Sequence, residues 1–201
     1  IRIGLSARIF LPEQDARGIR SKTLQVLEQS VAQWVMARGV LLLMVPSVVQ
    51  DGILMRSNIR LRDYAENLDG LILQGGADVS PRAYGEEPLR PEWSGDPVRD
   101  AYELELLHHA VAFAEKGQLA RWFGDATGGQ VVSIHHQAVN RLGRDLVVEA
   151  SSQDGVVEAL RGTGRGFVFG VQWHPEFHQQ AGLELLDCSP ILEAFLAAAR
   201  P

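Results

Sequence analysis

Cysteine is almost absent from the sequence, and so are long apolar runs. Cys188 is the single cysteine among 201 residues, which excludes an intrachain disulfide and is typical of a reducing cytoplasm. The longest apolar run, Val40–Val45, is far shorter than the roughly 20 residues that cross a bilayer. The chain opens at Ile1 without the charged and apolar segments of a signal peptide. We therefore expect a cytoplasmic protein that does not span a membrane.

Positive charge is also scarce. The 19 lysines and arginines are outnumbered by 25 aspartates and glutamates, which gives a net charge of -6. No block of like charge stands out, so nothing indicates a nucleic-acid or anionic-membrane partner. The length and apolar content fit one globular domain over residues 1–201. Small-molecule and protein partners stay open.

The apolar pattern of the first half predicts strands alternating with a helix. Residues 1–10 have the composition of a buried strand that runs into a loop. From Lys22 to Arg38 the apolar positions recur at helical spacing, with Ser21 as the expected N-cap. Continuous apolar runs at 40–46 and 68–76 predict strands that are covered on both faces.

The second half predicts one more helix and then several strands. Asp100 and Glu103 are spaced like a capping box, and the apolar residues after them predict a helix from Ala101 to Lys116. Later apolar runs predict three strands and a terminal helix, at 131–134, 146–150, 167–173 and 191–199. This order predicts an α/β fold, with a mainly parallel sheet, helices on both faces and a strand-rich C-terminal part.

The motif GVQWHPE carries the clearest chemical signal. A buried strand delivers His174 and Glu176 at its C-terminal end, where open α/β sheets bind their ligands, and Pro175 ends the strand. An imidazole can hold the proton of a nucleophile while a neighbouring carboxylate fixes its tautomer. We expect two members of a catalytic triad here, and the alternative is a hydrogen-bonded surface pair.

Two further motifs follow predicted strands. LILQGG ends in Gly75 and Gly76, whose amides could form an oxyanion hole, although such a pair is also typical of a plain turn. SIHHQAV places His135, His136 and Gln137 after a strand. These three could bind substrate, ligate a metal or hydrogen-bond within a loop. No second cluster of ligands has suitable spacing, so we expect no metal and no cofactor.

Cys188 is a poor candidate for the nucleophile. It lies in LLDCSPILEAF, ahead of the terminal helix, with no preceding strand and no glycine-flanked sharp turn to expose it. Reactive cysteines occupy partly exposed, electropositive places. We expect Cys188 to be a half-buried packing residue.

In this order, the motifs LQGGADVSPRAYGEE, SIHHQAV and DGVVEA…GVQWHPE resemble the γ-glutamyl-γ-aminobutyrate hydrolase branch, peptidase C26, of the class I glutamine amidotransferase-like family. The resemblance covers nearly the whole chain, including RDAYELELL at Arg99–Leu107. It implies a flavodoxin-like sheet and a Cys-His-Glu triad whose last two members are His174 and Glu176. It also implies that the glycine pair supplies oxyanion-hole amides and that the loop with the histidine pair lies near a γ-glutamyl substrate.

The resemblance also reveals that a segment is missing. Members of the family follow the RDxYE helix with a strand and a G-x-C-x-G elbow that carries the nucleophile, whereas this chain passes from EKGQ to LARWFG between Gln118 and Leu119. One strand–helix unit, at least about 30 residues, is not there. Loss of a central strand would be a larger defect than side-chain cavities that cost about 3 to 5 kcal/mol. We therefore favour a natural protein that is longer than this sequence.

The function implied by the resemblance is hydrolysis of γ-glutamyl amide bonds through a thioester intermediate. The substrate would be γ-glutamyl-GABA, a related γ-glutamyl amine or glutamine. Two alternatives stay open: a non-catalytic homologue that binds γ-glutamyl ligands, and a glutaminase subunit that delivers ammonia to a synthetase. A homodimer is allowed by the sequence but is not indicated by any motif.

Overall fold

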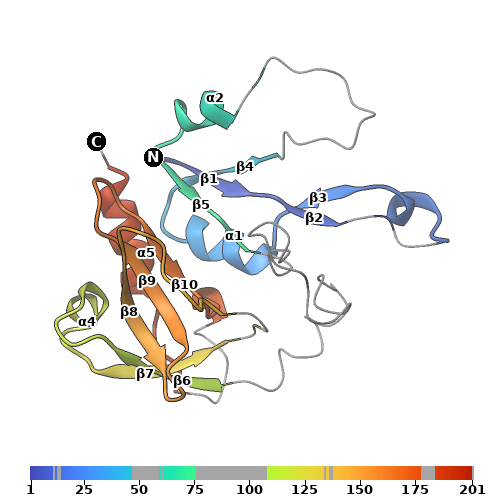
Figure 1. Ribbon diagram of the computed structural model, residues 1–201. Helices are drawn as coiled ribbons and strands as arrows, with labels where there is room; N and C mark the ends of the chain where they lie inside the picture. The colour runs from blue at the N-terminus through green and yellow to red at the C-terminus, as the bar shows by residue number, and fades with distance from the viewer. Residues whose placement is uncertain are drawn as a thin grey trace. The chain divides into compact units, whose positions relative to one another are not determined.

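The computed structural model describes two compact units of the chain (Figure 1). The described residues are 1–10, 12, 15–46, 59, 61–75, 108–133, 135, 138–177 and 184–200. The first unit holds the described residues up to Gly75 together with residues 199 and 200, and the second holds residues 108–198. That residues 1–201 form a single domain stays a prediction.

A three-stranded parallel sheet forms the centre of the first unit. Its strands, in the order β4-β1-β5, are β1 (Arg2–Ser6), β4 (Leu41–Val45) and β5 (Gly70–Ile72). Ile3 of the central strand lies opposite Leu42 on one side and Gly70 on the other. Ile3 and Leu5 are fully buried, as expected for a strand between two parallel neighbours. The predicted parallel sheet is confirmed. The prediction that β4 and β5 are covered on both faces is wrong, because Leu41, Leu43 and Leu71 are exposed.

A ribbon of two strands and three short helices complete the first unit. They are β2 (Arg8–Phe10), the 3-10 helix η1 (Gly18–Ser21), β3 (Leu24–Val26), α1 (Gln29–Met36) and α2 (Leu61–Ala65). β2 and β3 pair antiparallel, and α1 buries Val31 and Val35, one turn apart on one face.

The single helix predicted from Lys22 to Arg38 is wrong in its first third. Leu24 and Val26 lie in β3. They are spaced by two, as on one face of a strand, and pairing with β2 satisfies their backbone. The cap of the true helix is Glu28 rather than Ser21. The Ser21 hydroxyl instead donates to a carbonyl within η1.

An antiparallel five-stranded sheet forms the second unit, in the order β10-β9-β8-β6-β7. Its strands are β6 (His108–Phe113), β7 (Gly128–Val132), β8 (Leu146–Ser152), β9 (Val157–Gly162) and β10 (Phe169–Val171). The predicted strand-rich C-terminal part is confirmed. Figure 1 shows β8, β9 and β10 side by side in this unit.

The helix predicted from Ala101 to Lys116 is wrong over its described part, because residues 108–113 form β6. Val111 and Phe113 are buried while Ala112 between them is exposed, which is the period of a strand. β7 and β8 pair with the two edges of this segment, so its backbone is satisfied by neighbours rather than within a helix. The earlier residues of that prediction lie outside the described part of the chain.

Two helices pack near the sheet of the second unit, α4 (Gln118–Trp122) and α5 (Ser189–Ala198). α5 confirms the predicted terminal helix and buries Ile191, Leu192 and Leu196. An aromatic cluster joins these elements: the Trp122 ring lies 5.9 Å from Phe167 and 4.9 Å from Phe169, and Phe167 lies 5.9 Å from Phe195.

Glu149 is a buried carboxylate at a β-bulge in β8. The register shifts around it between Val148 and Ala150, and a bulge re-aims the side chain that it carries. Its carboxylate, 1% exposed, accepts hydrogen bonds from Arg161 Nε at 2.5 Å and from Leu119 N at 2.8 Å. Glu149 therefore links β8 to β9 and to the start of α4.

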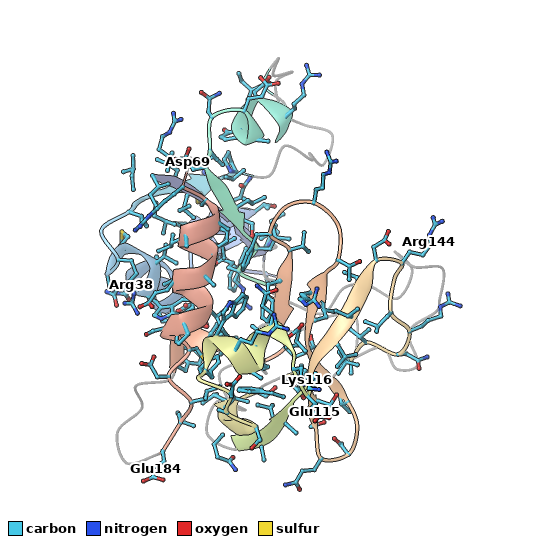
Figure 2. The ribbon with its side chains drawn as sticks, turned by 90° about the vertical axis from the view of Figure 1, so that its left-hand side faces the viewer. Arg38, Asp69, Glu115, Lys116, Arg144 and Glu184 are labelled. Atoms are coloured by element: carbon cyan, nitrogen blue, oxygen red, sulfur yellow. The ribbon has the colours of Figure 1, made fainter. Side chains whose placement is uncertain are left out.

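Charged side chains at turns mark the surface of each unit. The six that Figure 2 labels all lie outside helices and strands: Arg38, Asp69, Glu115, Lys116, Arg144 and Glu184. Within the described ranges, no helix combines the length and the apolar character that a membrane span requires.

Candidate active site

The chain reaches the HPE motif from β10 and is held there by two backbone hydrogen bonds. Gln172 N donates to Glu158 O at 2.8 Å, and His174 N donates to Val132 O at 2.8 Å. Pro175, which has no N–H, then opens a short 3-10 turn, η4 (Pro175–Phe177). The residues after β10 and the end of β7 therefore meet at His174.

His174 and Glu176 form a hydrogen-bonded pair within this turn. His174 Nδ1 lies 2.9 Å from Glu176 Oε1, and the Phe177 ring stacks on the imidazole at 5.1 Å. The glutamate side chain is 5% exposed and the histidine side chain 34%. With the Nδ1 proton donated to Glu176, Nε2 carries the lone pair and can accept a proton. This arrangement suits an acid–base group that is oriented by a sheltered carboxylate.

A second histidine–carboxylate pair lies at the same end of the sheet. His135 Nε2 is 3.2 Å from Glu158 Oε1, and the Ser133 hydroxyl donates to Glu158 Oε2 at 3.4 Å. Glu158 is 1% exposed, whereas His135 is 18% exposed. His135 follows the end of β7 at Val132, the residue whose carbonyl accepts from His174 N. The two pairs are therefore built on neighbouring segments of one unit.

Gly75 lies after β5 in the first unit, next to a well-anchored glutamine. Gln74 Nε2 donates to the carbonyls of Val26, at 3.2 Å, and Ser6, while Gln74 Oε1 accepts from Glu28 N at 2.9 Å. Gly75 has a φ of 75°, a conformation that only glycine adopts readily. The strand end before the glycine pair is thus fixed by side-chain bonds to β1, β3 and the cap of α1.

Three of the predicted site residues, Gly76, His136 and Gln137, lie outside the described part of the chain. The roles predicted for them stay predictions. Over the residues that the structure does cover, no three His, Cys, Asp or Glu side chains converge as a metal site would need.

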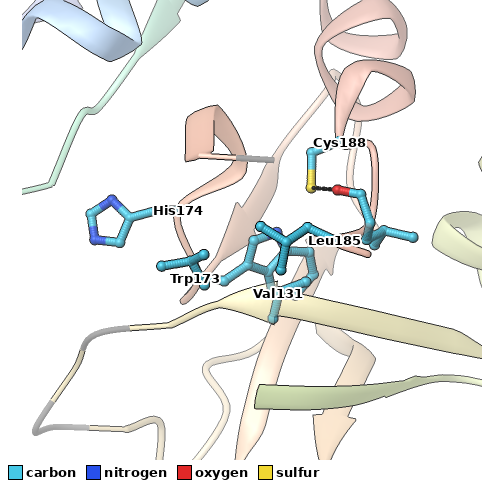
Figure 3. A pocket seen from close by; sticks show the side chains of 7 residues that line it. Val131, Trp173, His174, Leu185 and Cys188 are labelled. Atoms are coloured by element: carbon cyan, nitrogen blue, oxygen red, sulfur yellow. Dashed lines mark hydrogen bonds between the residues drawn. The ribbon is translucent and has the colours of Figure 1, made fainter. Parts of the chain in front are cut away.

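Cys188 lies in a closed apolar environment. Its side chain is 2% exposed, and the thiol donates to Leu186 O at 3.4 Å. Burial raises the pKa of the Cys188 thiol to about 12, and the charges of Asp187 and Glu176 act in the same direction. Figure 3 shows Cys188 and His174 on opposite sides of Trp173, with the imidazole directed away from the thiol. A thiol in this setting is a poor nucleophile.

The small pocket around Cys188 is not a substrate site. Its lining residues are mostly apolar: Val131, Val132, Trp173, His174, Leu185, Leu186 and Cys188. The space between them is too small to hold a water molecule. It is packing space beneath the HPE turn (Figure 3).

Two residues that support these sites, Glu158 and Gln74, were not among the residues predicted from the motifs. A signal existed for each of them. Glu158 is a lone carboxylate between Val157 and Ala159 in a strand-like stretch, and Gln74 is a lone amide that ends the run LIL. A polar group in a buried strand needs a partner, so each position was a candidate for a fixed hydrogen bond.

An α/β fold with a sheltered histidine–carboxylate pair beyond a strand is compatible with a hydrolase or amidotransferase type of protein, and the family comparison supports that class. The Peptidase C26 family model matches residues 3–113 and 106–176, and the chain belongs to this family of glutamine amidotransferase-like proteins.

Two relatives show how much of the family this chain covers. A protein described as glutamine amidotransferase-like from Rickettsia prowazekii is 28% identical over 171 residues, which cover 80% of this chain and 59% of that protein. The γ-glutamyl-γ-aminobutyrate hydrolase of Escherichia coli is 32% identical over 111 residues, which cover 55% of this chain and 43% of the enzyme. The chain therefore spans about half the length of these curated relatives.

Solved structures show the same fold. The glutaminase domain of CTPS from Trypanosoma brucei, with bound acivicin, matches at a TM-score of 0.55 and 18% identity, over 99% of this chain and 93% of that one. A protein described as a GMP synthase component from Thermoplasma acidophilum also matches at 0.55, with 15% identity, over 99% and 94%. At such identities the likeness shows the fold alone, which is that of glutamine amidotransferase domains.

Proposed function

We propose that the protein hydrolyses γ-glutamyl amide bonds, with His174 and Glu176 as its acid–base pair. The observation that carries the proposal is the 2.9 Å contact from His174 Nδ1 to Glu176 Oε1. It fixes the tautomer of a partly exposed imidazole by a sheltered carboxylate, as acyl-transfer enzymes require. Membership of the Peptidase C26 family and the named activity of the Escherichia coli relative favour a γ-glutamyl amide as substrate.

The nucleophile is a cysteine that the 201-residue sequence does not contain. Its thiol gives its proton to His174 Nε2, and the thiolate attacks the γ-carbonyl carbon of the substrate. The family resemblance implies that amides of Gly75 and Gly76 stabilise the resulting oxyanion. The imidazolium then protonates the leaving amine, which departs and leaves a γ-glutamyl thioester. Water, deprotonated by His174, hydrolyses the thioester to glutamate and restores the thiol.

The test is turnover by the natural full-length protein and by its His174→Ala variant. We expect release of GABA from γ-glutamyl-GABA, and a loss of about 10²- to 10⁴-fold in kcat for the variant, the range of a lost acid–base group. Arg144→Ala, in an exposed turn, is the control and keeps normal turnover. Unchanged kcat in the histidine variant would refute the proposed role.

A second candidate, a non-catalytic binding protein, is favoured by the state of Cys188. The only thiol of the 201-residue chain is buried and has a raised pKa, so this chain by itself has no means of forming a thioester. It would bind L-glutamine in a titration and release no glutamate or ammonia. Release of product by the 201-residue chain would reject this candidate.

A further inference from the structure

The chain that follows strand β5 lies beyond the hydrogen bonds of the sheet. The last pair of the parallel ladder joins Leu5 to Ile72, and β5 ends there. Leu73 is 74% exposed, and Gly75 is exposed with a φ of 75°. Glycine has more backbone freedom than any other residue, so the ladder does not determine the direction of the Gly75 amide. Other contacts have to fix it.

Gln74 supplies such contacts with every polar atom of its side chain. Nε2 donates to Ser6 O and to Val26 O, the latter at 3.2 Å, and Oε1 accepts from Glu28 N at 2.9 Å. The backbone N–H of Gln74 donates to Ser6 Oγ at 3.2 Å. A side-chain amide has two donor hydrogens and one acceptor oxygen, so none of these is left without a partner. We call these four hydrogen bonds the Gln74 clamp.

The clamp is attached to three separate elements. Ser6 is the last residue of β1 and Val26 the last of β3, while Glu28 is the N-cap of α1. Each of these elements has hydrogen bonds of its own, to β4, to β2 and within α1. Three of the four partner atoms belong to the main chain, so the clamp depends on no side-chain rotamer other than those of Gln74 and Ser6. Gln74 is therefore held from three sides.

We infer that Gln74 is a positioning residue, which holds the Gly75 amide in the direction that an oxyanion of the reaction requires. The Gly75 N–H belongs to the planar peptide unit that starts at Gln74, so the clamp limits the directions open to that N–H. Donors to a developing oxyanion are effective when they are fixed before the reaction starts. The inference rests on the proposed function and on the donor role that the family resemblance implies for Gly75. It adds the residue that keeps this donor in place.

A purely structural role of Gln74 would have a different signature. Formation and hydrolysis of the thioester both pass through an oxyanion, so a misplaced Gly75 amide slows both steps and leaves binding of the uncharged γ-amide unchanged. Loss of the clamp then lowers kcat and keeps KM. A residue that only stabilises the first unit would instead affect the melting temperature and keep the kcat of each folded molecule.

The experiment measures hydrolysis of γ-glutamyl-GABA by the natural full-length protein and by its Gln74→Met variant. Methionine keeps a long, flexible side chain and removes the amide. We expect kcat to fall by about 10- to 100-fold, less than the roughly 10²- to 10³-fold lost with an oxyanion donor, and KM to change by less than about twofold. Rates are expressed per active site, counted by iodoacetamide labelling of the nucleophile, since the buried Cys188 does not react.

Glu28→Gln is the matched control, because it disturbs a neighbour of the clamp without breaking the clamp. The Glu28 carboxylate caps α1, whereas Gln74 binds the backbone N–H of Glu28, which the variant retains. We expect Glu28→Gln to lower the melting temperature and to keep the wild-type kcat and KM at pH 7.

Ser6→Ala is a milder variant, which tests the inference even when Gln74→Met does not fold. It removes the hydrogen bond from Gln74 N and leaves the Ser6 carbonyl as a partner of Nε2. We expect kcat to fall by about three- to tenfold, the value of one neutral hydrogen bond, with KM unchanged.

Three results would overturn the inference alone. The first is a wild-type kcat per active site in Gln74→Met, or in Ser6→Ala where the former does not fold. The second is a raised KM with an unchanged kcat, which would make Gln74 part of substrate binding. The third is an equal loss of kcat in Glu28→Gln, which would show a general disturbance of the first unit. Absence of turnover by the wild type would overturn the proposed function and the inference with it, so the two failures are distinguishable.

Discussion

Glu28 caps helix α1 through its carboxylate, although a shorter polar side chain is usual at an N-cap. Its carboxylate accepts from Ser30 N at 3.1 Å, from Val31 N at 2.9 Å and from the Ser30 hydroxyl. Burial by itself raises the pKa of this carboxyl, but the hydrogen bonds and the nearby charge of Arg8 outweigh it and hold the pKa below its usual value. The ionised form is thus the stabilising one.

Because of this cap, we expect the first unit to lose stability at acid pH. A carboxyl with a depressed folded pKa contributes stability that is fully present above its unfolded pKa, near 4.5, and is lost as the pH falls through the folded value. We expect Glu28→Gln to lose about 1 kcal/mol at pH 7 and the difference from wild type to shrink below pH 4.5. Urea denaturation at several pH values measures it. A difference independent of pH would contradict this account.

Cys188 allows a clean labelling test, because it is the only thiol in the sequence. A pKa of about 12 leaves almost no thiolate at pH 8, and the 2% exposed side chain excludes a reagent. We expect no reaction with an aromatic disulfide reagent in the folded 201-residue chain, and one thiol per chain after unfolding in guanidinium chloride. Rapid stoichiometric labelling without denaturant would show that the thiol is accessible.

At the scale of elements, the aromatic cluster packs α4 against β10 and the residues just before it. Trp122 contacts both Phe167 and Phe169, and each aromatic pair contributes about 0.5–1.5 kcal/mol beyond its buried area. We expect Trp122→Ala to lower the free energy of unfolding by about 2–3 kcal/mol, somewhat less than a fully buried tryptophan would. Arg121→Ala, one position earlier and exposed, is the control and changes it by less than about 0.5 kcal/mol.

Element type was predictable where the apolar pattern had a single interpretation. β4, β8 and α5 lie within a few residues of the predicted runs. A short continuous apolar run and an isolated amphipathic helix each give one sequence pattern, although β4 itself is largely exposed. β3 and β6 were predicted as helix, since the deciding factor was a pairing partner elsewhere in the chain. Such pairings are not visible in local spacing.

The candidate site was predictable only in part, for a similar reason. His174 and Glu176 are two residues apart in the sequence, so a single turn brings them together. Glu158 is 23 residues from its partner His135, and Gln74 is 48 residues from Val26. The antiparallel sheet and the β2–β3 ribbon create these contacts, and neither could be derived before the strand order was known.

At the scale of the whole molecule, the structure gives a different expected position for the missing segment. The position between Gln118 and Leu119 followed from a helix that ends at Gly117. The structure instead has β6, a turn and α4, closed by Gly117 N to Ala114 O at 2.9 Å and by Leu119 N to Glu149 at 2.8 Å. The two family matches overlap at residues 106–113. We therefore propose that the segment with the nucleophile belongs ahead of β6.

This proposal predicts what the natural protein contains. We expect its intact mass to exceed 22.1 kDa, and peptide sequencing across residues 106–113 to reveal an inserted segment that carries a cysteine. Residues 114–122 should read without interruption in the same peptides. A mass of 22.1 kDa with no insertion would leave the binding protein as the remaining candidate.

The hydrogen bond from His174 N to Val132 O has a consequence for how such a protein can evolve. Together with Glu176 and Glu158, it gives each of the two histidines a contact from within residues 132–176. A lineage could therefore lose or regain its nucleophile through one internal deletion or insertion while this half of the site keeps its shape. Selection for ligand recognition and selection for turnover would then leave their substitutions in different stretches of the chain.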